Sequence, residues 1–216
     1  SPHLVNFNER IRVNDQEITD YDITLFMKKN MGLIKNINTT FFETTTAMAF
    51  DYFYKKSVDI AIIETGLGGR LDSTNVISPL VCGITSISLD HSDVLGDTIE
   101  KISKEKAGII KKNTPVYTFE QKENIVEIIK KRSAKNSAPL TIIKSDDIDL
   151  STVHNLGSIF KYKSYNIKLP LVGVHQVKNC VLAIKIAKML LSSTFNGLKV
   201  ENSVANIKWP GRLELI

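Results

Sequence analysis

The chain has little cysteine and no long apolar run, which excludes several classes of protein. Its 216 residues hold two cysteines and one tryptophan. Cys82 and Cys180 lie far apart, each inside an apolar run. We therefore expect buried free thiols in a reducing compartment, the cytoplasm, instead of a disulfide or a metal site. Because no apolar run approaches the ~18 residues of a membrane-spanning helix, we expect no membrane partner.

Glycine motifs that bind phosphate are also missing from these residues. None of the eleven glycines is followed by lysine, so the sequence contains no Walker-type phosphate loop. Gly66, Gly68 and Gly69 do not have the Gly-x-Gly-x-x-Gly spacing of a dinucleotide site. The chain opens on Ser1 instead of Met, from which we expect a processed or truncated protein. An enzyme that handles ATP through such a loop is expected to be incomplete here.

The composition is that of a globular protein, with 43% hydrophobic and 24% charged residues. The length allows one large domain or two small ones. The net charge is +5, and residues 101–135 alone hold ten Lys/Arg against four Glu. These lysines are spread among isoleucines at helical spacing and have few aromatic neighbours. A solvated basic helical face is therefore favoured over a nucleic-acid surface, and we expect no nucleic-acid partner.

Predicted strands and helices alternate along the chain. Four continuous apolar runs predict strands buried on both faces, as in a parallel sheet: 58–64, 81–87, 115–119 and 140–143. Apolar residues at helical spacing predict four helices: 40–56, 98–111, 120–135 and 174–191. Residues 158–170 alternate and predict a half-exposed hairpin. This order is typical of a three-layer α/β fold with a mostly parallel sheet.

Two of the predicted strands end in residues that could carry chemistry. The first ends at Glu64 before a glycine-rich turn, and the second is followed by Asp90 and His91. Ligands gather at the carboxyl ends of parallel strands, and a carboxylate with an imidazole there could hold a divalent cation such as Mg²⁺. A tight strand-to-helix turn and a helix cap explain the same residues without any ligand. Lys106, taken alone, reads as a surface lysine.

One long motif and six shorter ones run along the chain in a fixed order. The long one is Glu64-Thr65-Gly66-Leu67-Gly68-Gly69-Arg70-Leu71-Asp72-Ser73-Thr74-Asn75, and the others are Ser1-Pro2-His3-Leu4, Thr40-Phe41-Phe42-Glu43, Leu89-Asp90-His91, Glu105-Lys106-Ala107-Gly108-Ile109, Gly173-Val174-His175-Gln176-Val177-Lys178-Asn179 and Pro210-Gly211-Arg212-Leu213-Glu214. Together they resemble the folylpolyglutamate synthases and dihydrofolate synthases of the muramyl-ligase superfamily. The resemblance covers nearly the whole chain.

The resemblance implies an ATP-dependent ligase that adds L-glutamate to folates, with dihydropteroate as a further candidate substrate. In this family ATP phosphorylates a carboxylate of the folate. The amino group of glutamate then attacks the acyl phosphate, which gives an amide, ADP and phosphate. The implied cofactors are ATP and two Mg²⁺ ions, which stabilise the crowded negative charge. The implied partners are these small molecules, and the intact enzyme is expected to be a monomer.

The resemblance also assigns roles to single residues. Glu64 and His91 match magnesium ligands, and His91 is also counted as catalytic. Lys106 matches a lysine that is carbamylated in this superfamily. Carbamylation turns the amine into an anionic ligand, and it requires that the pKa of the lysine amine be lowered. The alternative is an exposed, unmodified lysine. The residues that match the pteridine site are Ser1, Thr40, Phe41, Phe42, Glu43, Leu71, Asp72 and Ser73. The residues that match nucleotide contacts are Asn179 and Arg212, and His175 is interpreted as structural.

The same resemblance implies that the chain is part of a larger enzyme. Residues 1–208 match a central ATP-ligase domain that lacks its phosphate-loop segment, and residues 209–216 match the start of a linker to a C-terminal Rossmann-like domain. We expect the 216 residues alone to bind ATP poorly and to have no synthase activity. Three alternatives stay open: a muramyl-peptide ligase, a non-catalytic ligase-like binding module, and a metallohydrolase built on Glu64 and His91, which lacks enough ligands and a base.

Overall fold

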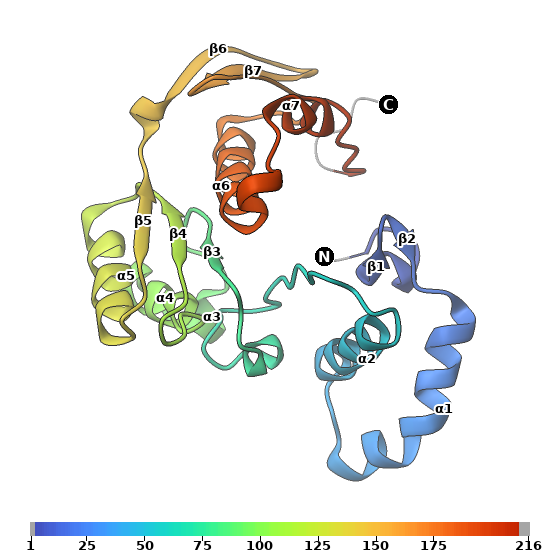
Figure 1. Cartoon of the computed structure of the whole chain (residues 1–216). Helices are drawn as coiled ribbons and strands as arrows, with labels where there is room; N and C mark the ends of the chain where they lie inside the picture. Colours follow the sequence, from blue (N-terminus) through green and yellow to red (C-terminus); the bar gives the residue numbers. More distant parts are fainter. Residues whose placement is uncertain (1–2, 212–216) are drawn as a thin grey trace. The chain divides into compact units, whose positions relative to one another are not determined.

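The computed structural model describes residues 3–211 (Figure 1). The described residues form two compact units, one within residues 1–77 (unit 1) and one within residues 78–216 (unit 2). Each unit has its own buried core. Among the described residues, no helix is long and apolar enough to cross a membrane.

Unit 1 is mostly helical. Its elements in chain order are η1 (Phe7–Arg10), β1 (Arg12–Val13), β2 (Gln16–Glu17), α1 (Asp20–Ile37), α2 (Phe41–Lys55) and η2 (Ser73–Val76). The strands β1 and β2 form a small antiparallel hairpin. The core of the unit collects side chains from the hairpin region and both helices, namely Ile11, Ile18, Phe26, Met48 and Tyr52.

Unit 2 holds a parallel sheet with helices on both faces. Its first elements are β3 (Cys82–Ile84), α3 (Ser92–Leu95), α4 (Ile99–Ala107), β4 (Val116–Phe119), α5 (Glu123–Lys135) and β5 (Leu140–Ile143). The strand order is β3-β4-β5, with Cys82 paired to Val116 and Val116 paired to Leu140. The runs predicted at 115–119 and 140–143 are therefore confirmed as neighbouring parallel strands, whereas the strand predicted over 81–87 is present only at residues 82–84.

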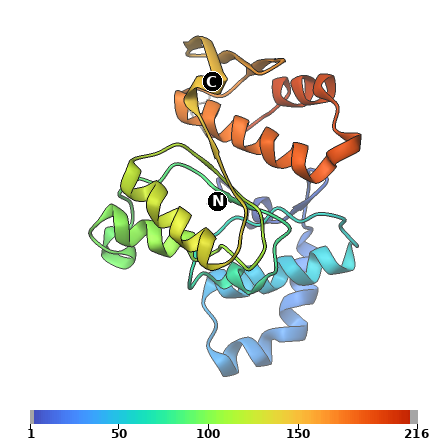
Figure 2. The same ribbon diagram turned by 60° about the vertical axis from the view of Figure 1, so that its left-hand side comes forward.

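The second half of unit 2 begins with η3 (Ser145–Asp147) and an antiparallel sheet. This sheet is formed by β6 (Ile148–His154), β7 (Gly157–Tyr162) and β8 (Tyr165–Leu169), and it is followed by α6 (Val174–Leu191), η4 (Ser192–Thr194) and α7 (Gly197–Ala205). The hairpin predicted at 158–170 is present as β7 and β8, with β6 added beside it. In Figure 2, α6 lies between the antiparallel sheet and the parallel strands, and it contacts both β4 and β7.

The two faces of the parallel sheet belong to different cores, which explains the three layers. Val116 packs with residues of α4 and α5, among them Ile102 and Ile129. Phe119, three residues further along β4, packs with Val181 of α6. Because side chains alternate along a strand, residues an odd number apart face opposite sides, so helices must cover both. The predicted three-layer α/β class with a mostly parallel sheet is confirmed.

One predicted strand is wrong. The run 58–64 has no strand pairing, and Ile62 in its middle is 94% exposed. A continuous apolar run is buried as a strand only where neighbouring backbone pairs with it and helices cover it. Within the described residues no strand pairs with this segment. The apolar pattern alone cannot supply that neighbour.

The prediction of two buried free cysteines is confirmed. Cys82 and Cys180 are free and buried, and they belong to different hydrophobic clusters. Burial raises the pKa of the Cys82 thiol, and it raises that of Cys180 to about 12. Both are therefore protonated packing residues and not reactive thiolates.

Candidate active site

In unit 1 the glycine-rich segment is a loop closed on itself by one carboxylate. Asp72 Oδ2 accepts hydrogen bonds from the backbone nitrogens of Gly66 and Leu67, both at 2.9 Å. Its other oxygen accepts from the backbone nitrogen of Thr74 at 3.0 Å and from the Thr74 hydroxyl. Four donors from both ends of the loop thus converge on one side chain. Asp72 also caps η2, which begins at the next residue.

The same loop is held against α2. A Cβ atom at Gly66 would lie 2.5 Å from the Phe42 ring, so a larger residue there would displace the ring. Next to it, the hydroxyls of Thr46 and Ser73 lie 3.0 Å apart. The structure therefore brings two predicted groups together, Phe42 of the first segment and Ser73 of the second. They form one wall made of α2 and the glycine-rich loop.

The start of α2 is fixed by a reciprocal cap. The Thr40 hydroxyl accepts from the Glu43 backbone nitrogen at 3.2 Å, and a Glu43 carboxylate oxygen accepts from the Thr40 nitrogen at 2.7 Å. The hydrogen bond from the Thr40 backbone is the main reason why the pKa of Glu43 is below its usual value. Thr40 and Glu43, predicted in the pteridine site, thus already have a structural role as a capping box.

The aromatic side chain that the α2 start leaves accessible is Phe41, which is 59% exposed. Its ring meets the Phe7 ring edge-on at 5.8 Å, and the Arg10 guanidinium lies 5.4 Å from its centroid. Arg10 Nε also donates to His3 Nδ1 at 2.7 Å. Phe42 packs under the loop, so Phe41 is the ring of the pair that is available to a flat ligand. Leu71 of the loop is also exposed.

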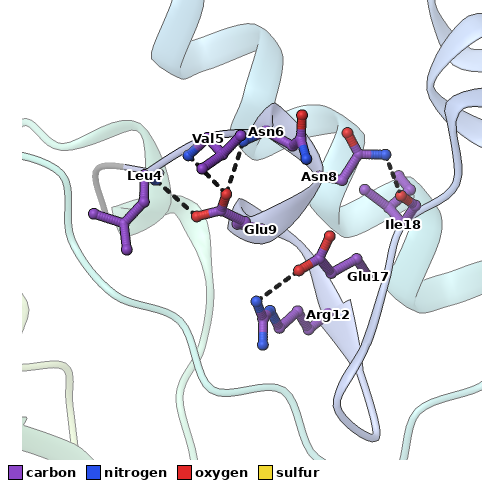
Figure 3. A network of polar contacts seen from close by, with 8 residues as sticks. All are labelled: Leu4, Val5, Asn6, Asn8, Glu9, Arg12, Glu17 and Ile18. Carbon is purple, nitrogen blue, oxygen red and sulfur yellow. Dashed lines mark hydrogen bonds and ion pairs between the residues drawn. The ribbon is translucent and has the colours of Figure 1, made fainter. Parts of the chain in front are cut away.

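A second carboxylate organises the segment that precedes these rings (Figure 3). Glu9 accepts hydrogen bonds from the backbone nitrogens of Leu4, Val5 and Asn6, at 2.7, 2.9 and 2.7 Å. These bonds, that from Asn6 first, lower the pKa of Glu9 to about 2. Sequence reasoning missed both Glu9 and Arg10. The Asn-x-x-Glu spacing from Asn6 to Glu9 is a capping-box signal that could have pointed to Glu9.

Unit 2 carries the predicted histidine and lysine on neighbouring elements. His91 immediately precedes α3, which packs against α4, the helix that carries Lys106 in its last turn. The backbone of His91 is left-handed, at φ 51° and ψ 41°, which is uncommon for a residue other than glycine. Its nitrogen donates to Asp90 Oδ1 at 2.9 Å, and its imidazole lies 3.7 Å from the other oxygen of Asp90. Lys106 is half-buried.

The predicted nucleotide residues are only partly described. Asn179 is exposed on α6, and its amide donates to Gln176 Oε1 at 3.4 Å. The His175 ring covers the backbone of Gly173, where a Cβ would lie 2.6 Å from it. This contact agrees with a structural interpretation of that histidine. Arg212 and Ser1 lie outside the described residues.

The two residues predicted to bind a metal lie in different units. Glu64 belongs to unit 1 and His91 to unit 2. Between residues 3 and 211 no group of three or more His, Cys, Asp or Glu side chains could hold a metal ion. A carboxylate and an imidazole are suitable ligands in kind, but two donors do not make a site. Magnesium binding by Glu64 and His91 therefore remains a prediction.

Comparisons with known proteins agree on one family. The model of the Mur ligase middle domain matches residues 16–187. The chain is 36% identical to a dihydrofolate synthase/folylpolyglutamate synthase of Bacillus subtilis over 236 residues, which covers 100% of this chain and 54% of that protein. The chain thus spans about half the length of the curated relatives it matches.

Solved structures of relatives have the same fold. A folylpolyglutamate synthase in complex with AMPPCP and folate superposes with a TM-score of 0.88 at 32% identity, over 99% of this chain and 56% of that one. The enzyme of Mycobacterium tuberculosis, complexed with ADP and AMPPCP, also gives a TM-score of 0.88 at 32% identity, over 99% of this chain and 52% of that one. The chain belongs to the Mur ligase middle domain family, and its relatives there are the folylpolyglutamate and dihydrofolate synthases.

Proposed function

We propose that the protein containing this chain uses ATP to add L-glutamate to folates through an acyl-phosphate intermediate. The observation that carries the proposal is the wall in unit 1, where Asp72 closes the glycine-rich loop and the loop is held on α2 by Phe42 and Ser73. The relatives support it, because one of them is a complex with AMPPCP and folate. Dihydropteroate is proposed as a second substrate, by similarity to the B. subtilis protein.

In this proposal the folate ring binds near the exposed Phe41. The ring of the substrate stacks on Phe41, while Arg10 offers positive charge beside it. Leu71 contributes an exposed apolar surface from the loop. Asp72 and Glu43 act mainly by fixing the loop and the helix start, since their oxygens already accept backbone hydrogen bonds.

In unit 2, His91, Lys106 and Asn179 are proposed to serve the nucleotide and the developing charge. Bound Mg²⁺ would supply charge neutralisation for the transferred phosphoryl group, with Glu64 and His91 as its ligands. Lys106, once carbamylated, would present an anion at the end of α4. Asn179 would contact the nucleotide from α6, and Arg212 would reach its phosphates. The +5 charge suits substrates that are all anionic.

The organisation proposed is a central ligase domain over residues 1–208, with 209–216 leading into a linker. Since these residues include no glycine followed by lysine, we propose that the 216-residue chain alone turns over no ATP and binds it poorly. We also propose a cytoplasmic monomer with folate, glutamate and ATP as its partners.

The test is incorporation of labelled glutamate. The 216-residue chain and the longest chain that its coding sequence encodes are each assayed with ATP, Mg²⁺ and one acceptor: tetrahydrofolate, dihydropteroate or a muramyl precursor. We expect glutamate transfer to tetrahydrofolate by the longer chain. Transfer only to the muramyl precursor would overturn the proposal in favour of a muramyl-peptide ligase. No transfer to any acceptor, with folate still bound, would favour a non-catalytic module.

A further inference from the structure

The chain between β3 and α3 is held without a strand ladder. The pairing of β3 with β4 ends at Ile84 and Thr118. Residues 85–91 then lead to Asp90 and His91 with no assigned strand, although Ile87 is only 8% exposed. Buried backbone groups need hydrogen-bond partners, so another group must replace the ladder here.

Gln121, two residues beyond the end of β4, supplies those partners. Its Oε1 accepts from the Ile87 nitrogen at 2.6 Å, and its Nε2 donates to the Thr85 carbonyl at 3.4 Å. The same Nε2 donates to Thr118 Oγ1 at 3.0 Å, and that hydroxyl donates to the Ile84 carbonyl at 2.8 Å. Thr118 is fully buried. The side chains of Thr118 and Gln121 thus replace the backbone hydrogen bonds beyond the last backbone pair of β3 and β4.

The chemistry of this bridge is specific to a glutamine. An amide of this length offers an acceptor and two donors at one end. Glutamate in its place would retain the acceptor for the Ile87 nitrogen but would have no donor for Thr85 or Thr118. Leucine would fill a similar volume but would offer neither a hydrogen-bond acceptor nor a donor. Among these three side chains only the glutamine amide makes all three hydrogen bonds.

We propose that Gln121 is a positioning residue, which fixes residues 85–87 and thereby the place where His91 is presented. The importance of His91 rests on the proposed function, whereas the bridge itself does not. The left-handed backbone of His91 is further restrained on its other side, because its carbonyl accepts from the nitrogens of Val94 and Leu95, at 3.1 and 2.9 Å. The segment that carries His91 is thus held at Ile87 before the histidine and at α3 after it.

The first test is hydrogen exchange of the 216-residue chain, measured peptide by peptide with its urea stability determined in parallel. Gln121→Leu is expected to speed exchange at Ile87 by about tenfold or more, beyond any change in the β5 and α6 peptides. Asn196→Ala is the matched control, because it removes a side chain that accepts from two backbone nitrogens at the start of α7. It is expected to leave exchange in residues 84–91 unchanged.

Two results would overturn the proposal. Exchange at Ile87 in the leucine variant could equal that of the wild type, or it could rise by the same factor throughout unit 2. If the leucine variant does not fold, Gln121→Glu decides. It retains the acceptor for the Ile87 nitrogen, so we expect exchange there to be intermediate and exchange at the neighbouring amides to rise. Wild-type exchange throughout 84–91 in that variant would contradict the bridge.

Kinetics of the active form separate this inference from the proposed function. Gln121→Leu is expected to lower kcat by about tenfold with a smaller change in the KM for folate, because Phe41 and the loop of unit 1 are untouched. His91→Ala tests the function itself. Loss of protection at Ile87 with unchanged kcat would overturn the role of Gln121 in the reaction. If His91→Ala is also fully active, then the assignment of His91 fails and the bridge stands.

Discussion

The Asp72 carboxylate lies 2.9 Å from the backbone nitrogen of Gly66, six residues earlier in the chain. The same oxygen accepts from Leu67, while the other oxygen serves Thr74. Because a carboxylate offers about four acceptor positions, these bonds fill it. Asp72, which the motif assigns to the proposed pteridine site, thus holds the glycine-rich loop together.

Replacement of Asp72 by Asn should therefore loosen the loop. The new amide group would present a donor to backbone donors, so at least one pair of hydrogen bonds is lost. We expect a loss of about 1–2 kcal/mol in unfolding free energy and faster exchange at residues 66–69, measured by urea denaturation and hydrogen exchange. Asp51→Asn, which removes a surface ion pair with Lys55, is the control and should change stability by less than about 0.5 kcal/mol. Equal effects of the two substitutions would contradict this prediction.

Substitution by alanine at two glycines of unit 1 should change the unfolding free energy in opposite directions. At Gly66 the added Cβ would meet the Phe42 ring at 2.5 Å, so the ring must move and we expect a loss of about 1–3 kcal/mol. At Gly32, exposed inside α1, nothing lies within 4 Å, so alanine should add about 0.5–1 kcal/mol. Thermal or urea unfolding of both variants checks the pair. The double variant Gly66→Ala/Phe42→Leu should recover part of the loss, and a stable Gly66→Ala protein would refute the close contact.

Glu9 should make the stability of unit 1 depend on pH in the acid range. Its pKa is about 2 in the folded chain and 4.5 ordinarily, because three backbone N–H groups stabilise the charged form. A lowered folded pKa means that the stabilisation is complete above about pH 4.5 and is lost as the pH falls toward about 2.

The urea midpoints of wild type and Glu9→Gln measure this contribution. Their difference should be constant from about pH 7 to 5 and should shrink at lower pH. Glu17→Gln, which removes a surface pair with Arg12, is the control, because Glu17 lies in the neighbouring hairpin of the same unit. A difference for Glu9→Gln that persists unchanged at about pH 2 would show that the carboxylate charge is not what matters.

We predict that Lys106 contributes to activity as a carbamate, which carries a negative charge. If the lysine is carbamylated, then Lys106→Ala and Lys106→Arg should both lower kcat by about 100-fold or more, and a small carboxylate added to the alanine variant should restore part of it. Lys104→Ala is the matched control, since Lys104 is exposed in the same last turn of α4. Labelled bicarbonate should give a carbamate NMR signal that Lys106→Ala lacks. An active Lys106→Arg enzyme would favour the unmodified, positive lysine.

The structure contains the predicted elements whose apolar pattern lies within the segment itself. The strand at 116–119 and the helix at 174–191 follow from apolar periodicity, and their boundaries agree within a residue. The helix α1 over Asp20–Ile37 was missed, although Thr19 caps it and Asn38 ends it in a left-handed conformation. Those cap signals were available in the sequence.

The sequence predicted which residues belong to the candidate site but not how their side chains are arranged. The motif named Phe41, Phe42 and Asp72, but it could not say which would face solvent. Phe42 lies under Gly66 while Phe41 is exposed, because the direction of α2 relative to the loop decides which ring is covered. Gln121 carries no motif at all, since its role exists only where β4 lies beside the end of β3.

The sequence by itself determined the family, the alternation of strands and helices, and the buried thiols, because repeated local patterns and a long motif record these directly. The tertiary structure alone decided that the run 58–64 is unpaired, that Asp72 and Glu9 hold loops by backbone hydrogen bonds, and that Gln121 extends the β3–β4 ladder. Each of these depends on which backbone groups have a neighbour, and that is fixed only when distant segments meet.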